Sequence, residues 1–180
     1  MEIYGEFLKG KNDKRWRIEH AQVVTPEDRA LFSKYSIIPS VQPTHATSDM
    51  RWADKRLCNT RMNGAYAYKS LLALNGWMPL GTDFPVEDIS PLKTFFAAVY
   101  RQDTKNQPMG GFQMEEALSP KEALLGMTLW AARGNTMEQK IGSLEKGKLA
   151  DFVILAEDIY PEKYMLKTKV TGTYLEGIKK

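Results

Sequence analysis

The chain has 180 residues, enough for one buried core, and its 43% hydrophobic and 26% charged residues are typical of a globular protein. Its formal net charge of +3, with Lys and Arg dispersed among acids, does not indicate a nucleic-acid-binding surface. A single cysteine, Cys58, excludes an internal disulfide and a cysteine-ligated zinc cluster. No apolar run approaches the ~18 residues of a membrane helix, and the N-terminus lacks a signal peptide's apolar core, so we expect a cytoplasmic protein.

The first strand-like run covers residues 16–24 and is followed directly by a helix signal. The run alternates in polarity and is rich in β-branched residues, which predicts a strand that ends near His20. Thr25 and Pro26 are suited to the N-cap and the first helical position, and acidic residues follow in the first turn. This segment therefore predicts a strand followed by a helix.

Two further strands are predicted in the first half of the chain. Residues 37–41 form the second, in which Pro39 indicates the beginning of the strand or an irregular edge. A helix is expected over residues 63–74, and Gly76 follows it as a stop signal. Residues 78–82 then form a short buried strand.

The connection between the second strand and the helix that follows it, residues 42–62, shows no convincing periodicity and predicts an ordered loop over a pocket. Helices are expected over residues 90–102 and, after a Ser-Pro-Lys-Glu capping box, over residues 119–132. Residues 151–155 and 167–175 read as strands. No low-complexity segment interrupts this order.

Alternation of strands and helices implies a parallel sheet with right-handed crossovers. Three strands cannot close a barrel, which needs eight strands and typically ~250 residues. The favoured fold is α/β, made of the last three βα units of a (β/α)8 TIM-type barrel (residues 1–138) followed by C-terminal strands of a small β-sandwich (residues 139–180). An open sheet that resembles part of a barrel is the alternative.

Candidate functional residues follow each of the three predicted strands. Ligands and metals bind beyond the carboxyl ends of parallel strands, where His20, His45 and Asp83 are placed. His20 is a candidate metal ligand, with a packed structural histidine as the alternative, and Asp83 either binds metal or begins a turn. Gln42 contacts substrate or ends its strand. Strand alternation points Glu19 away from His20, which indicates a structural role.

Four segments resemble the C-terminal third of a family 3 amidohydrolase, in the right order and with natural spacing. They are Arg-Ile-Glu-His-Ala-Gln at residues 17–22, Ser-Val-Gln-Pro-Thr-His-Ala-Thr-Ser-Asp-Met at 40–50, Gly-Thr-Asp-Phe-Pro at 81–85, and Gly-Ser-Leu-Glu-Lys-Gly-Lys-Leu-Ala-Asp at 142–151. Gly-Thr-Asp alone would be weak, but the four together in register are specific.

This resemblance implies a metal-dependent hydrolase of non-peptide carbon–nitrogen bonds in small amide-type substrates, with zinc as the expected divalent metal. His20 and Asp83 would bind the metal, because the family's sixth and last barrel strands end in such a histidine and aspartate. Asp83 would also transfer a proton from water to the leaving nitrogen. His45 lies farther from its strand end, so we expect it to contact the substrate or polarise its oxyanion, with a histidine on the loop surface as the alternative. Gln42 is the second residue expected to contact the substrate.

The remaining metal ligands of the family are absent from this sequence. They are a His-x-His pair on the first strand, a lysine or glutamate from the middle strands and a histidine on the fifth. A missing N-terminal portion or a homo-oligomer partner would have to complete the site, and the chain alone is expected to be inactive. The alternative function is a non-catalytic α/β module that oligomerises or docks onto a partner chain. A nucleotide-binding domain is excluded, because no strand leads into a Gly-rich phosphate loop.

Overall fold

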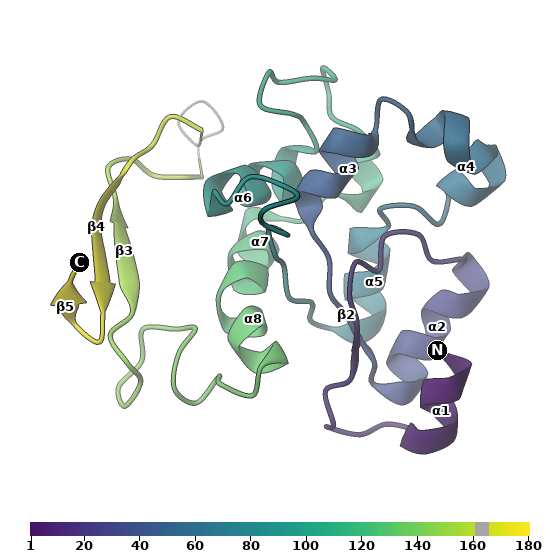
Figure 1. The fold of residues 1–180 in the computed structure, drawn as a ribbon, viewed down its shortest axis with the longest axis horizontal. Coiled ribbons are helices and arrows are strands. Elements are labelled where there is room, and N and C mark those ends of the chain that lie inside the picture. The colour runs from purple at the N-terminus through teal and green to yellow at the C-terminus, as the bar shows by residue number, and fades with distance from the viewer. Residues whose placement is uncertain (161–165) are drawn as a thin grey trace.

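The computed structural model describes residues 1–160 and 166–180. Figure 1 shows a body of helices around short parallel strands, with a small antiparallel sheet beside it. The elements in chain order are α1 (Glu2–Leu8), β1 (Arg17–Ile18), α2 (Pro26–Tyr35), β2 (Ile38–Pro39), α3 (Pro43–Asp49), α4 (Ala53–Met62), α5 (Tyr68–Asn75), α6 (Pro91–Tyr100), the 3-10 turn η1 (Met114–Glu116), α7 (Pro120–Met127), α8 (Leu129–Gly134), β3 (Phe152–Leu155), β4 (Val170–Leu175) and β5 (Ile178–Lys179).

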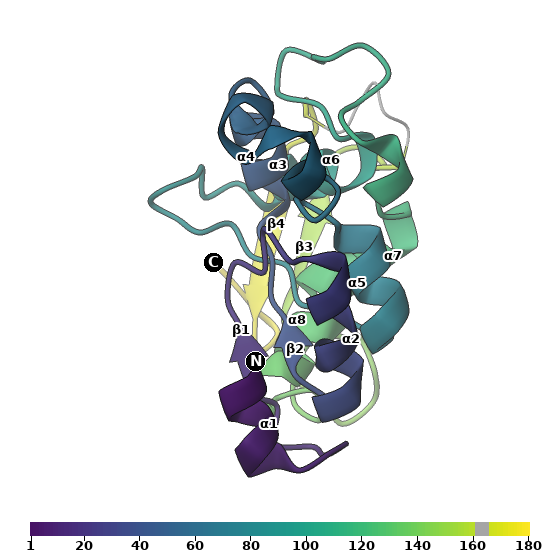
Figure 2. The same ribbon diagram turned by 90° about the vertical axis from the view of Figure 1, so that its right-hand side faces the viewer.

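Three extended segments run parallel through the body, as the sequence predicts. β1 pairs with β2 in the register Arg17 to Ile38, and an isolated parallel bridge joins Val41 to Leu80. The segment that contains β2 therefore lies between the other two. Turned by 90°, the ribbon has α3, α4 and α6 at one end and α1 at the other (Figure 2).

The strands are shorter than predicted, and Pro39 explains part of the difference. The amides of Ile38 and Ser40 donate hydrogen bonds to the carbonyls of Trp16 and Ile18, on the side of β1. The next amide that can point toward the third segment belongs to Val41, because proline has no N–H. Pro39 thus lies in the middle segment and not at an edge, and pairing with the third segment begins only at Val41.

Residues 42–62 are not a loop, so that prediction is wrong. The helix α3 begins at Pro43 and is buried on almost every side. The helix α4 is mostly exposed, and Ala53 is its buried residue. A helix that is buried all round and one that is exposed all round both lack an amphipathic stripe. Periodicity therefore had no signal with which to detect either helix.

The predicted helix over residues 63–74 begins later, at Tyr68. Ala65 instead forms an antiparallel bridge with Val23, and the Tyr66 amide donates to the Gln22 carbonyl. The segment after α4 thus pairs with the chain that leaves β1. The helix ends as predicted, with Gly76 in the left-handed region at φ 79°.

The helix starts signalled by Ser or Thr before Pro are confirmed. The Thr25 side chain accepts a hydrogen bond from the Asp28 amide at the start of α2. At α7 the full capping box forms, with Ser119 and Glu122 bonding each other's amides. The predicted helix over residues 119–132 is interrupted at Thr128, whose φ and ψ are −120° and −93°, and continues as α8.

We expect Ser119→Ala to lower the free energy of unfolding by about 1 kcal/mol, because it removes one half of a reciprocal cap. Ser90→Ala is the matched control, since Ser90 also precedes Pro at a helix start but its side chain makes no capping bond. Urea unfolding of both variants measures the difference. Equal losses in the two variants would contradict this reading of the cap.

Buried residues of the helices around the parallel segments form a hydrophobic core. α2 packs on α5, α3 on α6, and α6 on α7. Fully buried members include Phe32, Ile37, Val41, Leu71 and Met78. Within residues 1–160 and 166–180, every helix falls short of the length and apolar character that a bilayer crossing requires.

The C-terminal strands form a separate three-stranded antiparallel sheet in the order β3-β4-β5. Turns dominate residues 141–148, as predicted, and lead from α8 to this sheet. Several apolar side chains on it are half or more exposed, including Val153 at 54% and Ile178 at 62%. In Figure 1 the sheet stands beside α7 and α8, outside the main helical body.

Candidate metal centre

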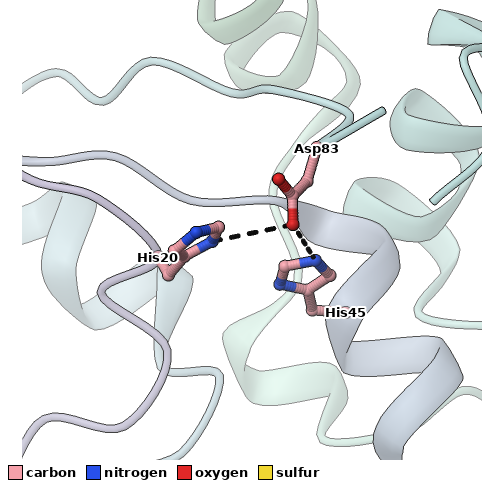
Figure 3. A group of neighbouring side chains, drawn as sticks. All are labelled: His20, His45 and Asp83. Atoms are coloured by element: carbon pink, nitrogen blue, oxygen red, sulfur yellow. Dashed lines mark ion pairs between the residues drawn. The ribbon is translucent and has the colours of Figure 1, made fainter. Parts of the chain in front are cut away.

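Three candidate ligands converge at one end of the parallel segments. His20 follows β1 by two residues, His45 lies in the first turn of α3, and Asp83 follows the Leu80 bridge by three residues. One ligand atom from each side chain lies within 4.8 Å of the others, and Figure 3 shows the Asp83 carboxylate facing both imidazoles. The sequence predicted the common edge from strand order, and the structure brings these three residues together there.

The two histidines approach Asp83 differently. His45 Nε2 lies 3.3 Å from Asp83 Oδ2, whereas His20 Nδ1 lies 4.0 Å from the same oxygen. The imidazole rings stack with 5.6 Å between centroids. His45 Nε2 is buried but makes no hydrogen bond of acceptable geometry, so its approach to Asp83 leaves this nitrogen unpartnered.

His20 and Asp83 both have a left-handed backbone conformation. Their φ values are 62° and 60°, in the region where residues other than glycine are uncommon. The Asp83 carbonyl accepts from the amides of Val86 and Glu87. Asp83 therefore does begin a turn, and that turn leaves its carboxylate facing the histidines.

Gln42 connects His20 to Glu19. Gln42 Oε1 lies 2.9 Å from His20 Nδ1, and Gln42 Nε2 donates to Glu19 Oε1 at 3.0 Å. Glu19 also accepts from the Ser40 hydroxyl and pairs with Arg17. Glu19 thus reaches His20 through Gln42, which is in keeping with the structural role expected for it.

His45 reaches the centre because of α3. The helix begins at Pro43 and returns the chain toward Asp83. His45 therefore lies close to Asp83 in space, although several residues separate it from the end of its strand. The Tyr68 hydroxyl donates to the Gln42 carbonyl at 3.2 Å and secures the N-terminal end of this helix.

A second polar group beside α3 was not predicted. Asp49 Oδ2 accepts hydrogen bonds from the Gln22 side chain at 2.5 Å and the Tyr66 hydroxyl at 2.9 Å. Burial raises the pKa of Tyr66 to about 12. The hydrogen bond with Gln22 lowers this pKa, and the hydrogen bond to Asp49 raises it. Tyr66 and Asp49 are 17 residues apart in the sequence, and no motif links them, so their contact was not predictable. Gln22, in contrast, lies within the sequence run that includes His20.

The donor set suits a divalent transition metal. Imidazole nitrogen and carboxylate oxygen are zinc ligands, and catalytic zinc sites commonly use three protein ligands with one open position. In a tetrahedral site with bonds of ~2.1 Å, neighbouring ligand atoms lie roughly 3.4 Å apart. The His45–Asp83 distance of 3.3 Å is close to that spacing, and the distance of 4.0 Å between His20 Nδ1 and Asp83 is longer. A centre of this kind can hold a metal ion that activates water for hydrolysis.

Comparison with known proteins gives the family. The sequence profile described as "Amidohydrolase family" matches residues 7–177, so the chain belongs to this family. It is 38% identical over 170 residues to the protein LONG AFTER FAR-RED 3 of Arabidopsis thaliana. The aligned region covers 93% of this chain and 29% of that protein. It is 31% identical over 148 residues to the putative amidohydrolase YtcJ of Bacillus subtilis, covering 82% of this chain and 28% of that protein.

Among solved structures, an uncharacterized metal-dependent hydrolase from Pyrococcus horikoshii superposes with a TM-score of 0.64 and 31% identity. The match covers 73% of this chain and 26% of that one. The chain thus spans less than a third of the length of these relatives. The resemblance to the amidohydrolase family inferred from the four sequence segments is confirmed.

Proposed function

We propose that this chain is the C-terminal part of a metal-dependent hydrolase that cleaves non-peptide carbon–nitrogen bonds in small amide-type substrates. The observation that carries the proposal is the convergence of His20, His45 and Asp83 within 4.8 Å at one edge of three parallel segments. Membership of the amidohydrolase family supports the same chemistry.

The proposed architecture follows the parallel pairing. Residues 1–138 correspond to the last three βα units of a TIM-type barrel, and residues 139–180 to a segment of a small β-sandwich. The parallel order of β1, β2 and the Leu80 segment supports the first part, and the antiparallel β3-β4-β5 sheet supports the second. The remaining strands would come from an N-terminal portion or a partner copy, because three strands do not close a barrel.

His20 and Asp83 are the proposed metal ligands, and zinc fits their imidazole and carboxylate donors. The metal would act as a Lewis acid toward water and the substrate carbonyl. Asp83 would accept a proton at its carboxylate and return it to the leaving nitrogen, a transfer that needs a base close to the reacting atoms. His45, with its unpartnered Nε2, would face the substrate, whereas the amide of Gln42, which we expected to do so as well, bonds His20 and Glu19.

Hydrolysis in the presence and absence of metal tests this function. The complete enzyme that contains this chain should release amine from a panel of N-acylated amines and amino acids. Removing metal with 1,10-phenanthroline should abolish release, and added Zn²⁺ should restore it. Activity that survives complete metal removal would contradict the proposal.

A non-catalytic docking module is the second candidate, and the exposed apolar side chains of the β3-β4-β5 sheet favour it. A module of this kind would bind a partner chain with full affinity after Asp83→Asn, and no amide substrate would be turned over by the complete assembly. Turnover in the assay above therefore separates the two candidates.

A further inference from the structure

We propose that Gln42 fixes the position of the proton on His20, holding it on Nδ1 and leaving the Nε2 lone pair free. Gln42 is in this view a positioning residue that acts through His20. The inference follows from the hydrogen bonds around its amide group, and only its consequence for metal binding rests on the proposed function.

Glu19 determines which way the Gln42 amide faces. A carboxylate can only accept hydrogen bonds, and Glu19 Oε1 lies 3.0 Å from Gln42 Nε2. If the amide were flipped, its oxygen would face that carboxylate oxygen, and two acceptors would repel each other. Ser40 and Arg17 hold Glu19 in place from its other sides, at 2.5 Å and 3.3 Å. The NH₂ group of Gln42 is thereby assigned to Glu19 and its oxygen to His20.

The oxygen of Gln42 in turn determines the state of His20. Gln42 Oε1 lies 2.9 Å from His20 Nδ1, a normal hydrogen-bond distance, so Nδ1 must carry the hydrogen. The other acceptor near Nδ1, Asp83 Oδ2 at 4.0 Å, is too distant for a hydrogen bond but also favours a donor there. In neutral imidazole a hydrogen on Nδ1 leaves Nε2 as the nitrogen with a lone pair.

Gln42 is held firmly enough to enforce this choice. The residue is 5% exposed, and its carbonyl accepts from the buried Tyr68 hydroxyl. Gln42 is also the N-cap of α3 but makes no side-chain capping bond, so its amide is committed to Glu19 and His20. A fixed acceptor on one nitrogen is the usual means by which proteins orient a metal-binding histidine and select the nitrogen it offers.

Long-range ¹H–¹⁵N NMR of the metal-free chain tests the proposal directly, because the nitrogen shifts distinguish the two tautomers of neutral imidazole. The chain has two histidines, so His45→Gln assigns the signals by elimination. At a pH where His20 is neutral we expect the Nδ1–H tautomer. A predominant Nε2–H tautomer at His20 would overturn the proposal whatever the protein's activity.

Substitution supplies a second readout. Gln42→Leu removes the acceptor with little change in size and should shift His20 toward the Nε2–H tautomer. Gln22→Leu is the matched control, since Gln22 bonds Asp49 and Tyr66 and makes no bond to His20. It should leave the tautomer unchanged, and equal shifts in both variants would overturn the proposal. Far-UV circular dichroism establishes that each variant is folded.

The consequence for metal is measured separately. By calorimetric titration with Zn²⁺, Gln42→Leu should weaken binding by about 10–100-fold, the range found when a group that orients a metal ligand is removed. If His20 is in the Nδ1–H tautomer but the complete wild-type enzyme binds no Zn²⁺, the proposed function fails and the positioning role of Gln42 stands. If Zn²⁺ binds but Gln42→Leu changes neither affinity nor tautomer, the positioning role fails alone.

Discussion

Asp83→Asn should lower turnover by the complete enzyme at least ~10³-fold and leave the fold intact. The amide has nearly the same shape, but it cannot accept a proton as a carboxylate does, and it withdraws the negative charge from the metal. Proton transfer by a positioned side chain contributes typically ~10²–10⁴-fold on its own. Because Asp83→Asn removes both the proton acceptor and the negative charge at the metal, we expect it to lower turnover more than a substitution at any other residue of the centre.

The fold is expected to survive this substitution for a specific reason. Asp83 has φ 60°, and asparagine is one of the few residues that tolerate this region. The bonds from the Val86 and Glu87 amides go to the Asp83 carbonyl and do not depend on its side chain. Asp54→Asn, on the exposed part of α4, is the matched control and should retain full activity. Near-normal turnover by Asp83→Asn would contradict the role assigned to its carboxylate.

His20→Asn should lower Zn²⁺ affinity by more than about 100-fold, beyond the effect of disturbing a group that merely orients a ligand. Asparagine again tolerates the backbone, since His20 has φ 62°. The side chain of His20 is 49% exposed, so its loss creates no buried cavity and should spare the fold. Calorimetric titration of the chain with Zn²⁺ measures the change.

His45→Gln gives the comparison that separates the two histidines. If His45 faces the substrate, its loss should lower kcat/KM strongly and Zn²⁺ affinity only weakly. Equal losses of Zn²⁺ affinity in His20→Asn and His45→Gln would contradict the division of roles proposed for them, and would place His45 among the metal ligands at its 3.3 Å distance from Asp83.

Local chemistry made much of the fold predictable. The N-cap at Thr25, the capping box at Ser119 and the stop at Gly76 each depend on neighbouring residues alone, and each is present in the structure. The common edge of His20 and Asp83 followed from the parallel order of strands. These features need no knowledge of tertiary packing.

The missed features depend on contacts between distant segments. α3 and α4 escaped detection because burial on all sides, or on almost none, produces no periodicity. The bonds of Glu19 to Ser40 and Gln42 join residues more than 20 positions apart in the sequence, so spacing did not predict them. The Gln42 bridge between His20 and Glu19 spans more than 20 residues, so sequence spacing could suggest its chemistry but not its partners.

Metal content of the purified chain tests the central claim most directly. Elemental analysis after dialysis against Zn²⁺ and then metal-free buffer should find about one zinc ion per folded chain, reduced in both His20→Asn and Asp83→Asn. Mass in solution, measured on the same sample, shows whether a partner copy contributes to the site. A well-folded wild-type chain without zinc would mean that the rest of the site lies outside this chain, whereas zinc that is retained after both substitutions would contradict the assignment of His20 and Asp83 as metal ligands.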